Sequence, residues 1–275
     1  MQSVDQLKRD GYIIIRDIFT RDSIEVLRAK IREIFEHTGT YKYGGKYKLH
    51  AMHESAEVAR LIFSSTFVKA IKGCTYPHSC LLTGECDLHI DILSNWHKDV
   101  KEAWAKKTSV HSDPAWGVYK AAIYLQDQDE KCAGAFKVRP GSHLLRLGEA
   151  TEVKALPVRA GDVVIFDVRI DHMGRNASLG SRMLRWGLTL VGRCLEVDHE
   201  MPFAVARARL ARFAGSTPQR MAAYLTFGPN LPCTYDYEEM GRADHGAVPN
   251  ALDAAVMAKL ANEHIQFIHP QVMAS

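Results

Sequence analysis

Short β-rich runs separated by turn signals fill the middle of the chain, from about residue 75 to residue 195. Glycine and proline clusters such as Pro140-Gly141 and Ala160-Gly161-Asp162 interrupt these runs and predict strands joined by turns. Many short strands with long connections are typical of an antiparallel barrel or jelly roll. The candidate strands are Leu88–Leu93, Val118–Leu125, Ala135–Val138, Val163–Val168 and Leu184–Val191.

Helices are expected on both sides of this β core. Before it, the β-branched run Tyr12–Ile15 predicts a strand between two helices, and residues 40–50 predict a polar loop. After it, helices are expected over 201–214, 217–226 and 250–264, with an extended loop over 228–249. No flexible linker is visible, so we expect one domain over 1–275. Its parts are N-terminal helices and a strand (1–75), a jelly-roll core (76–195) and a helical C-terminal extension (196–275).

The composition excludes several classes of protein. The 275 residues are 47% hydrophobic and 24% charged with a net charge of +3, which excludes a disordered chain, a coiled coil and a collagen-like fibre. The chain contains no basic run that would indicate a nucleic-acid partner, and no stretch of 18 apolar residues that would indicate a membrane span. No export signal is evident and the six cysteines form no CxxC pair, so we expect a cytoplasmic protein with reduced thiols. The oligomeric state is left open.

Three His-x-Asp triplets suggest a metal site: His89-Ile90-Asp91, His97-Lys98-Asp99 and His111-Ser112-Asp113. On an extended segment residues i and i+2 point to the same side, so each triplet could hold one metal ion with a distant histidine. Two histidines and one carboxylate leave three open positions, which is typical of non-haem Fe(II) oxygenases. For any single triplet, the ordinary alternative is a surface histidine beside a solvated aspartate.

The surroundings of the second triplet carry a more specific pattern. Its parts, in order, are Trp96-His97-Lys98-Asp99, a strand from Gly134 ending in Pro140-Gly141-Ser142-His143, a Gly161-Asp162 strand leading to His172, and then Asn176 and Arg182. This order resembles the phytanoyl-CoA dioxygenase-like family of Fe(II)/2-oxoglutarate-dependent oxygenases. The resemblance covers roughly residues 5–195.

The resemblance implies a double-stranded β-helix, a jelly-roll and cupin-like barrel with flanking helices. It implies that His97, Asp99 and His172 bind iron, and we favour this triplet over those of His111 and His89. It also implies that Arg182 binds the distal carboxylate of 2-oxoglutarate, because a planar guanidinium matches a carboxylate bidentately. Arg185 is the competitor; on a regular strand the two arginines would face opposite sides.

The resemblance implies an enzyme that uses Fe(II), 2-oxoglutarate and O2 to oxidise a C–H bond of a small molecule, releasing succinate and CO2. Hydroxylation is the default outcome, with desaturation or ring closure as alternatives. Two other classes remain as hypotheses: a non-catalytic metabolite-binding barrel, and a cupin-like metal enzyme that does not use 2-oxoglutarate. The lysines after the first ligands, Lys98, Lys101, Lys106 and Lys107, indicate either a solvated face or attraction of an anionic substrate. His111 and Asp113 could line the site from the loop.

Overall fold

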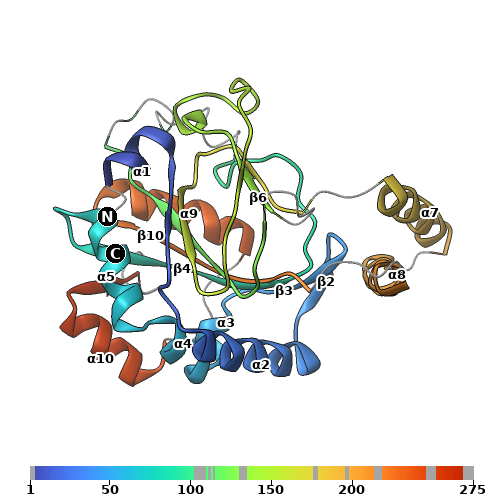
Figure 1. The fold of residues 1–275 in the computed structure, drawn as a ribbon, viewed down its shortest axis with the longest axis horizontal. Coiled ribbons are helices and arrows are strands. Elements are labelled where there is room, and N and C mark those ends of the chain that lie inside the picture. Colours follow the sequence, from blue (N-terminus) through green and yellow to red (C-terminus); the bar gives the residue numbers. More distant parts are fainter. Residues whose placement is uncertain are drawn as a thin grey trace.

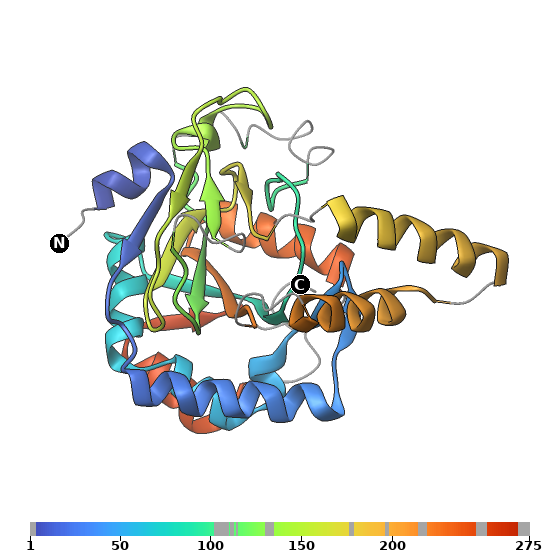
Figure 2. The ribbon, with the colours of Figure 1, turned by 45° about the vertical axis from the view of Figure 1, so that its right-hand side comes forward.

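The computed structural model describes residues 4–101, 110, 113, 115–129, 135–175, 179–195, 198–213, 219–245 and 252–268. Its centre is a pair of facing β-sheets (Figures 1 and 2). The larger sheet has the order β1-β8-β5-β10-β4-β3-β2, with β11 parallel to β4 at one end, and the smaller has the order β7-β6-β9. The strands are β1 (Tyr12–Ile15), β2 (Thr40–Lys42), β3 (Gly45–Lys48), β4 (Cys80–Ile90), β5 (Tyr119–Tyr124), β6 (Phe136–Val138), β7 (Lys154–Leu156), β8 (Val163–Asp167), β9 (His172–Met173), β10 (Met221–Pro229) and β11 (Ile265–Phe267).

The expectation of a jelly-roll core with flanking helices is confirmed. Within the residues described, the two sheets face each other without merging into one closed sheet. Helices lie around them, with α2, α4 and α10 along one side of the larger sheet (Figure 1). The helices are α1 (Val4–Asp10), α2 (Arg21–His37), α3 (Ala51–Glu54), α4 (Ala56–Ile62), α5 (Ser65–Thr75), α7 (Leu179–Leu195), α8 (Glu200–Phe213), α9 (Pro232–His245) and α10 (Ala254–Asn262).

Strand β5 shows how the alternation of side chains divides the core in two. Ala121 and Ile123 point to the side covered by helices and join the larger hydrophobic cluster. Ala122 and Tyr124 point the other way, into the space between the two sheets. This follows from the two-residue period of a strand. The space between the sheets is where the candidate site lies.

The predicted N-terminal strand between two helices is confirmed. Helix α2 begins after Thr20, whose side chain accepts a hydrogen bond from the backbone N–H of Ser23. Its buried face carries Ile24, Leu27 and Ile31 at helical spacing. Residues 40–50, however, are not simply a loop, because β2 and β3 form a hairpin there.

Three expectations for the C-terminal half are wrong. The expected strand Leu184–Val191 lies inside helix α7, the expected helix 217–226 is largely strand β10, and the expected loop 228–249 contains helix α9. Strand β10 runs between β4 and β5, so the helical extension over 196–275 in fact supplies a central strand of the sheet. The alanines Ala222 and Ala223 suggest a helix, but here they fit a strand that is buried on both faces.

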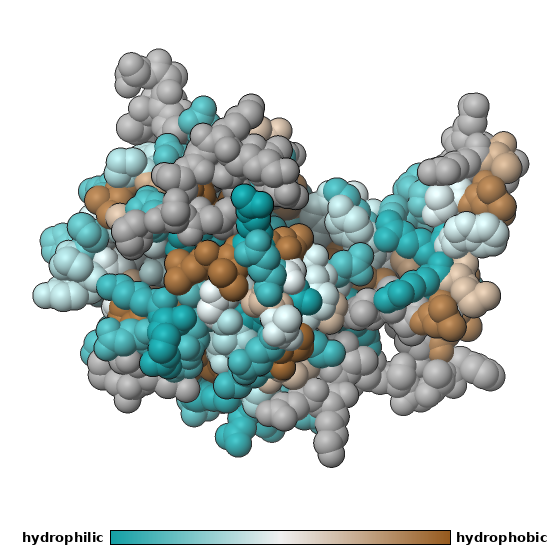
Figure 3. All heavy atoms as spheres, turned by 90° about the horizontal axis from the view of Figure 1, so that it is seen from above, coloured by the Kyte–Doolittle hydropathy of each residue, from teal (hydrophilic) through white to brown (hydrophobic). Residues whose placement is uncertain are grey.

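Helices α7 and α8 form an arm that stands away from the rest of the protein (Figures 1 and 2). The arm is attached through α8, where the Arg207 guanidinium donates to the backbone oxygens of Gly44 (2.8 Å) and Asp91 (2.6 Å). Large hydrophobic side chains of α7 are exposed, namely Leu179, Met183, Trp186 and Leu190. In the space-filling view, hydrophobic residues are visible on the arm, to the right of the main body (Figure 3).

None of the helices in the part of the chain that the structure describes has the length and apolar character needed to cross a membrane. The five described cysteines, Cys74, Cys80, Cys86, Cys194 and Cys233, are free thiols.

Candidate active site

The structure brings His97, Asp99 and His172 together at one end of the space between the sheets. His97 and Asp99 lie in the segment after β4, and His172 begins β9. The backbones of His97 and His172 form an antiparallel bridge, with N–H···O distances of 3.0 and 2.9 Å. Two segments 75 residues apart are thereby fixed side by side before any side chain is considered.

The side chains of these residues converge on one point. The Asp99 Oδ1 atom lies 3.6 Å from Nε2 of His97 and 3.6 Å from Nε2 of His172. Nδ1 of His97 lies 2.7 Å from the backbone oxygen of Asn95, and Nδ1 of His172 lies 3.1 Å from that of Ile170. A proton on each Nδ1 satisfies these carbonyls and leaves both Nε2 lone pairs free to bind a metal.

The charge state of the cluster suits a cation. Burial, and then the neighbouring His97, lower the pKa of His172 to about 3, so its imidazole is neutral at neutral pH. Burial opposes ionisation of Asp99, but the positive charge of Lys120 holds the pKa of this carboxyl below its ordinary value. Two imidazoles and one carboxylate form the donor set typical of a non-haem Fe(II) site. These three residues could hold such an ion.

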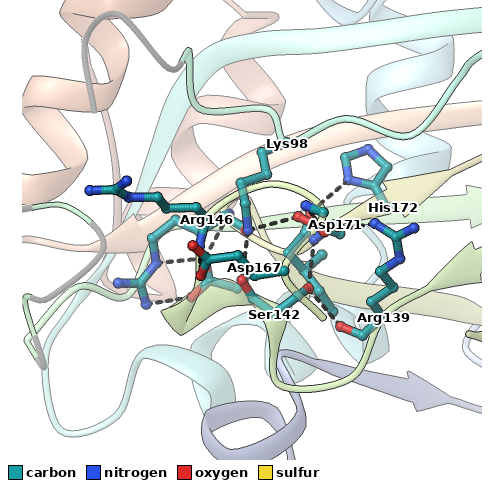
Figure 4. Close-up of polar contacts among 11 residues, drawn as sticks. Lys98, Arg139, Ser142, Arg146, Asp167, Asp171 and His172 are labelled. Atoms are coloured by element: carbon teal, nitrogen blue, oxygen red, sulfur yellow. Dashed lines mark hydrogen bonds and ion pairs between the residues drawn. The ribbon is translucent and has the colours of Figure 1, made fainter. Parts of the chain in front are cut away.

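A buried ion pair ties the two ligand segments together (Figure 4). Lys98, the middle residue of the triplet, places its Nζ 2.9 Å from Oδ1 of Asp171, the residue before His172. The same Nζ donates to the backbone oxygens of Ser142 and Arg169. Lys98 is therefore buried and paired, which removes it from the solvated face or substrate-attracting group suggested by the sequence.

The other two triplets do not join this cluster among the residues described. His89 lies on β4, where its ring contacts that of Tyr224 at 4.7 Å between centroids. Asp91 follows the strand in a left-handed conformation (φ 55°) and pairs with Arg175 at 3.1 Å. Asp113 accepts a hydrogen bond from the backbone N–H of Ala115. His111, like Asn176, lies outside the described residues.

Arg182 and Arg185 lie on helix α7, not on a strand. Arg182 and Arg185 therefore do not face opposite sides as expected, because residues three apart on a helix share one side. Both line the cavity from the arm. Arg185 is ion-paired with Glu200 at 2.9 Å.

Arg220 is a cavity residue that the sequence argument missed. It lies just before β10, its side chain is buried, and its Nη2 is 3.4 Å from the Tyr124 hydroxyl and 3.3 Å from the Tyr224 hydroxyl. A Cβ atom on Gly174 would lie 3.1 Å from both terminal nitrogens of Arg220, so the guanidinium packs directly on the backbone two residues after His172. No local signal in the sequence marks Arg220, because the alanines that follow it suggest a helix instead of the strand that places it beside the cavity.

One cavity of about 1100 Å³ joins these features. It is lined on one side by His97, Asp99 and His172 (the triad), together with Lys120 of β5 and Arg220. Further residues come from the β2–β3 hairpin and the arm, namely Lys42, Tyr43, Tyr47, Arg182, Arg185, Trp186 and Phe203. This volume lies slightly above the usual range of about 300–1,000 Å³ for small-molecule sites.

Solved structures of similar fold share this architecture. The epimerase SnoN from nogalamycin biosynthesis, described as non-haem and α-ketoglutarate-dependent, aligns with a TM-score of 0.56 at 16% identity, over 82% of this chain and 80% of its own. HygX from Streptomyces hygroscopicus, solved with nickel and 2-oxoglutarate, aligns with a TM-score of 0.54 at 14% identity, over 82% of this chain and 87% of its own. EctD from S. alaskensis aligns with a TM-score of 0.54 at 18% identity, over 82% of this chain and 75% of its own. At these identities the likeness is one of fold.

The sequence itself identifies the family. No curated protein matches the chain significantly. The family model described as phytanoyl-CoA dioxygenase matches residues 7–184, well over half of the 275 residues. The protein therefore belongs to the phytanoyl-CoA dioxygenase family of non-haem enzymes that depend on iron, 2-oxoglutarate and O2.

Proposed function

We propose that this protein hydroxylates a C–H bond of a small anionic molecule, with His97, Asp99 and His172 as the iron ligands. The observation that carries the proposal is the convergence of three donor atoms within 4.8 Å of one another in a cavity that also contains a buried arginine. In the balanced reaction one oxygen atom of O2 enters the substrate and the other enters succinate, with release of CO2. The chemistry supplied by bound iron is the activation of O2, coupled to this decarboxylation.

Arg220, rather than Arg182, is proposed to bind the distal carboxylate of 2-oxoglutarate. The Arg220 side chain is buried, whereas Arg182 lies on the exposed arm. A buried guanidinium is worth more to an anionic ligand than one in water, since less solvent screens the charge. The hydroxyls of Tyr124 and Tyr224 hold the guanidinium in place and could also donate to the same carboxylate.

The anionic character of the substrate is proposed from the basic side chains on the outer part of the cavity. Lys42 of β2 and the arginines Arg182 and Arg185 of α7 line it from opposite elements. Among the described residues, the acidic side chains that line the cavity are Asp99, paired with Lys120, and Asp87, which accepts a hydrogen bond from the His50 N–H. The excess of positive charge would raise the local concentration of an anion.

The test is turnover by protein that has been reconstituted with Fe(II) under anaerobic conditions. Succinate release is measured with 2-oxoglutarate and a panel of carboxylates and phosphate esters, each paired with a neutral analogue. We expect one or more anions to stimulate succinate release, with product heavier by one oxygen atom that derives from labelled O2. Stimulation by neutral analogues alone would contradict the anionic class. An epimerised or cyclised product would replace hydroxylation as the outcome.

A further inference from the structure

The two carboxylate oxygens of Asp99 face different partners: one faces the two histidines of the triad and the other faces Lys120. Oδ1 of Asp99 faces the Nε2 atoms of both histidines, at 3.6 Å from each. Oδ2 lies 3.0 Å from Nζ of Lys120, which reaches into the cavity from β5. One oxygen is thus presented to a metal ion and the other is held by an ammonium group.

The ammonium group is itself held in place. Nζ of Lys120 lies 3.3 Å from Oε2 of Glu85 on β4. The same carboxylate oxygen accepts hydrogen bonds from the Thr226 hydroxyl of β10 (2.7 Å) and the Tyr237 hydroxyl of α9 (3.2 Å). Only 14% of the Lys120 side chain is exposed. Four elements therefore fix the position from which Lys120 contacts Asp99.

We propose that Lys120 is a positioning residue that keeps Asp99 a one-oxygen ligand. Carboxylates bind metal ions through one or both oxygens, and a second Asp99 oxygen would occupy one of the three positions that the triad leaves open. 2-Oxoglutarate needs two of those positions and O2 the third. By holding Oδ2, Lys120 would keep all three of these positions open. This inference rests on the proposed function.

The simpler alternative is that Lys120 only neutralises buried Glu85. Two substitutions separate these roles. Lys120→Met removes the ammonium group at similar side-chain length, while Glu85→Gln removes the acidic charge and leaves Lys120 beside Asp99. Because Lys120→Met strands a buried carboxylate and could impair folding, the double variant Lys120→Met/Glu85→Gln removes both charges together.

Calorimetry of the full-length metal-free proteins measures Ni(II) binding first, and 2-oxoglutarate binding to the Ni(II)-loaded proteins second. We expect every variant to bind Ni(II) within about threefold of wild type. We expect 2-oxoglutarate to bind at least about tenfold more weakly to Lys120→Met and to the double variant, because the second Asp99 oxygen would occupy a position that 2-oxoglutarate needs, and changes around metal ligands typically cost about tenfold or more in activity. Glu85→Gln should bind 2-oxoglutarate as wild type does.

Loss of a positive charge would by itself weaken binding of a dianion, so the coordination is measured directly. Crystal structures of Ni(II)-loaded wild type and the double variant should show one Asp99 oxygen on the metal in the former and two in the latter. An unmoved Oδ2, or a parallel loss of Ni(II) and 2-oxoglutarate binding in all variants, would overturn the inference. Failure of wild type to bind Ni(II) and 2-oxoglutarate would instead overturn the proposed function.

Discussion

Lys98 and Asp171 form a buried ion pair, with 2.9 Å between Nζ and Oδ1, that joins the segment of two candidate ligands to the segment of the third. Each residue is the chain neighbour of a triad member, so the pair fixes the spacing of the triad without touching a metal. Arg139 completes the pair by contacting the second oxygen of Asp171 at 3.2 Å. The positions of the triad residues are therefore supported by a buried ion pair, although the sequence pattern alone suggests that Lys98 is a surface lysine.

We predict that Lys98→Met lowers the free energy of unfolding by about 3–5 kcal/mol, because it leaves Asp171 buried with only part of its compensation. Ni(II) binding should weaken as well, since the two ligand segments lose their link. Urea unfolding and calorimetry measure the two effects. The control is Lys30→Met, because Lys30 forms its ion pairs with Glu33 and Glu57 at the surface and should matter little. Equal effects of the two substitutions would contradict the role of Lys98.

We predict that His97→Ala and His172→Ala each remove measurable Ni(II) or Fe(II) binding and all 2-oxoglutarate turnover, while circular dichroism stays that of the folded protein. His89→Ala is the matched control, because His89 belongs to another triplet and lines the same cavity. It should retain metal binding. Loss of metal binding in His89→Ala together with retention in His97→Ala would move the metal site to the other triplet.

We predict that Arg220→Met raises the apparent KM for 2-oxoglutarate by roughly tenfold or more, because a charge-assisted hydrogen bond contributes about 1.5–3 kcal/mol. Arg182→Met, on the arm, should leave that KM close to wild type and change the KM for the organic substrate instead. The reverse pattern would return the 2-oxoglutarate role to Arg182.

The role of Arg220 can also be tested by substituting Gly174, because the guanidinium packs on the backbone of this glycine. Gly174→Ala would place a Cβ 3.1 Å from the Arg220 guanidinium and 3.0 Å from the Ser94 hydroxyl, so the guanidinium must shift. We predict weaker 2-oxoglutarate binding with Ni(II) binding kept, measured by calorimetry. Gly180→Ala, where a Cβ meets nothing within 4 Å, is the control. Unchanged 2-oxoglutarate binding in Gly174→Ala would argue against Arg220.

Acid should destabilise the metal-free protein partly through His89. Burial, with the charges of Arg220 and Lys120, lowers the pKa of His89 to about 3. The unfolded chain, with an ordinary histidine pKa of about 6.5, binds the extra proton between these values. Stability is therefore retained above about pH 6.5 and falls as the pH drops toward 3, by at most about 1.4 kcal/mol per unit for this group.

Urea unfolding at pH 7, 6 and 5 measures this slope. His89→Gln should make the slope shallower than that of wild type, whereas His37→Gln, at an exposed position of α2, should leave it unchanged. An identical slope in His89→Gln would show that His89 does not contribute.

Local patterns in the sequence are enough to predict some of the elements. The spacing of Ile24, Leu27 and Ile31 predicted helix α2, and the β-branched run Tyr12–Ile15 predicted β1, because amphipathic and buried periods are properties of adjacent residues. The resemblance of short motifs also pointed to His97, Asp99 and His172, which the structure places together.

The completion of the sheet depends instead on contacts between segments that are distant in the chain. Strand β10 gains hydrogen bonds from β4 on one side and β5 on the other, and that gain outweighs the helical preference of its alanines. In the chain, the arm formed by α7 and α8 lies between β9 and β10. The buried arginine that lines the cavity is therefore Arg220, which lies beyond the positions that the motif spacing suggests. Pairing between distant strands is a non-local interaction, and no local period in the sequence encodes it.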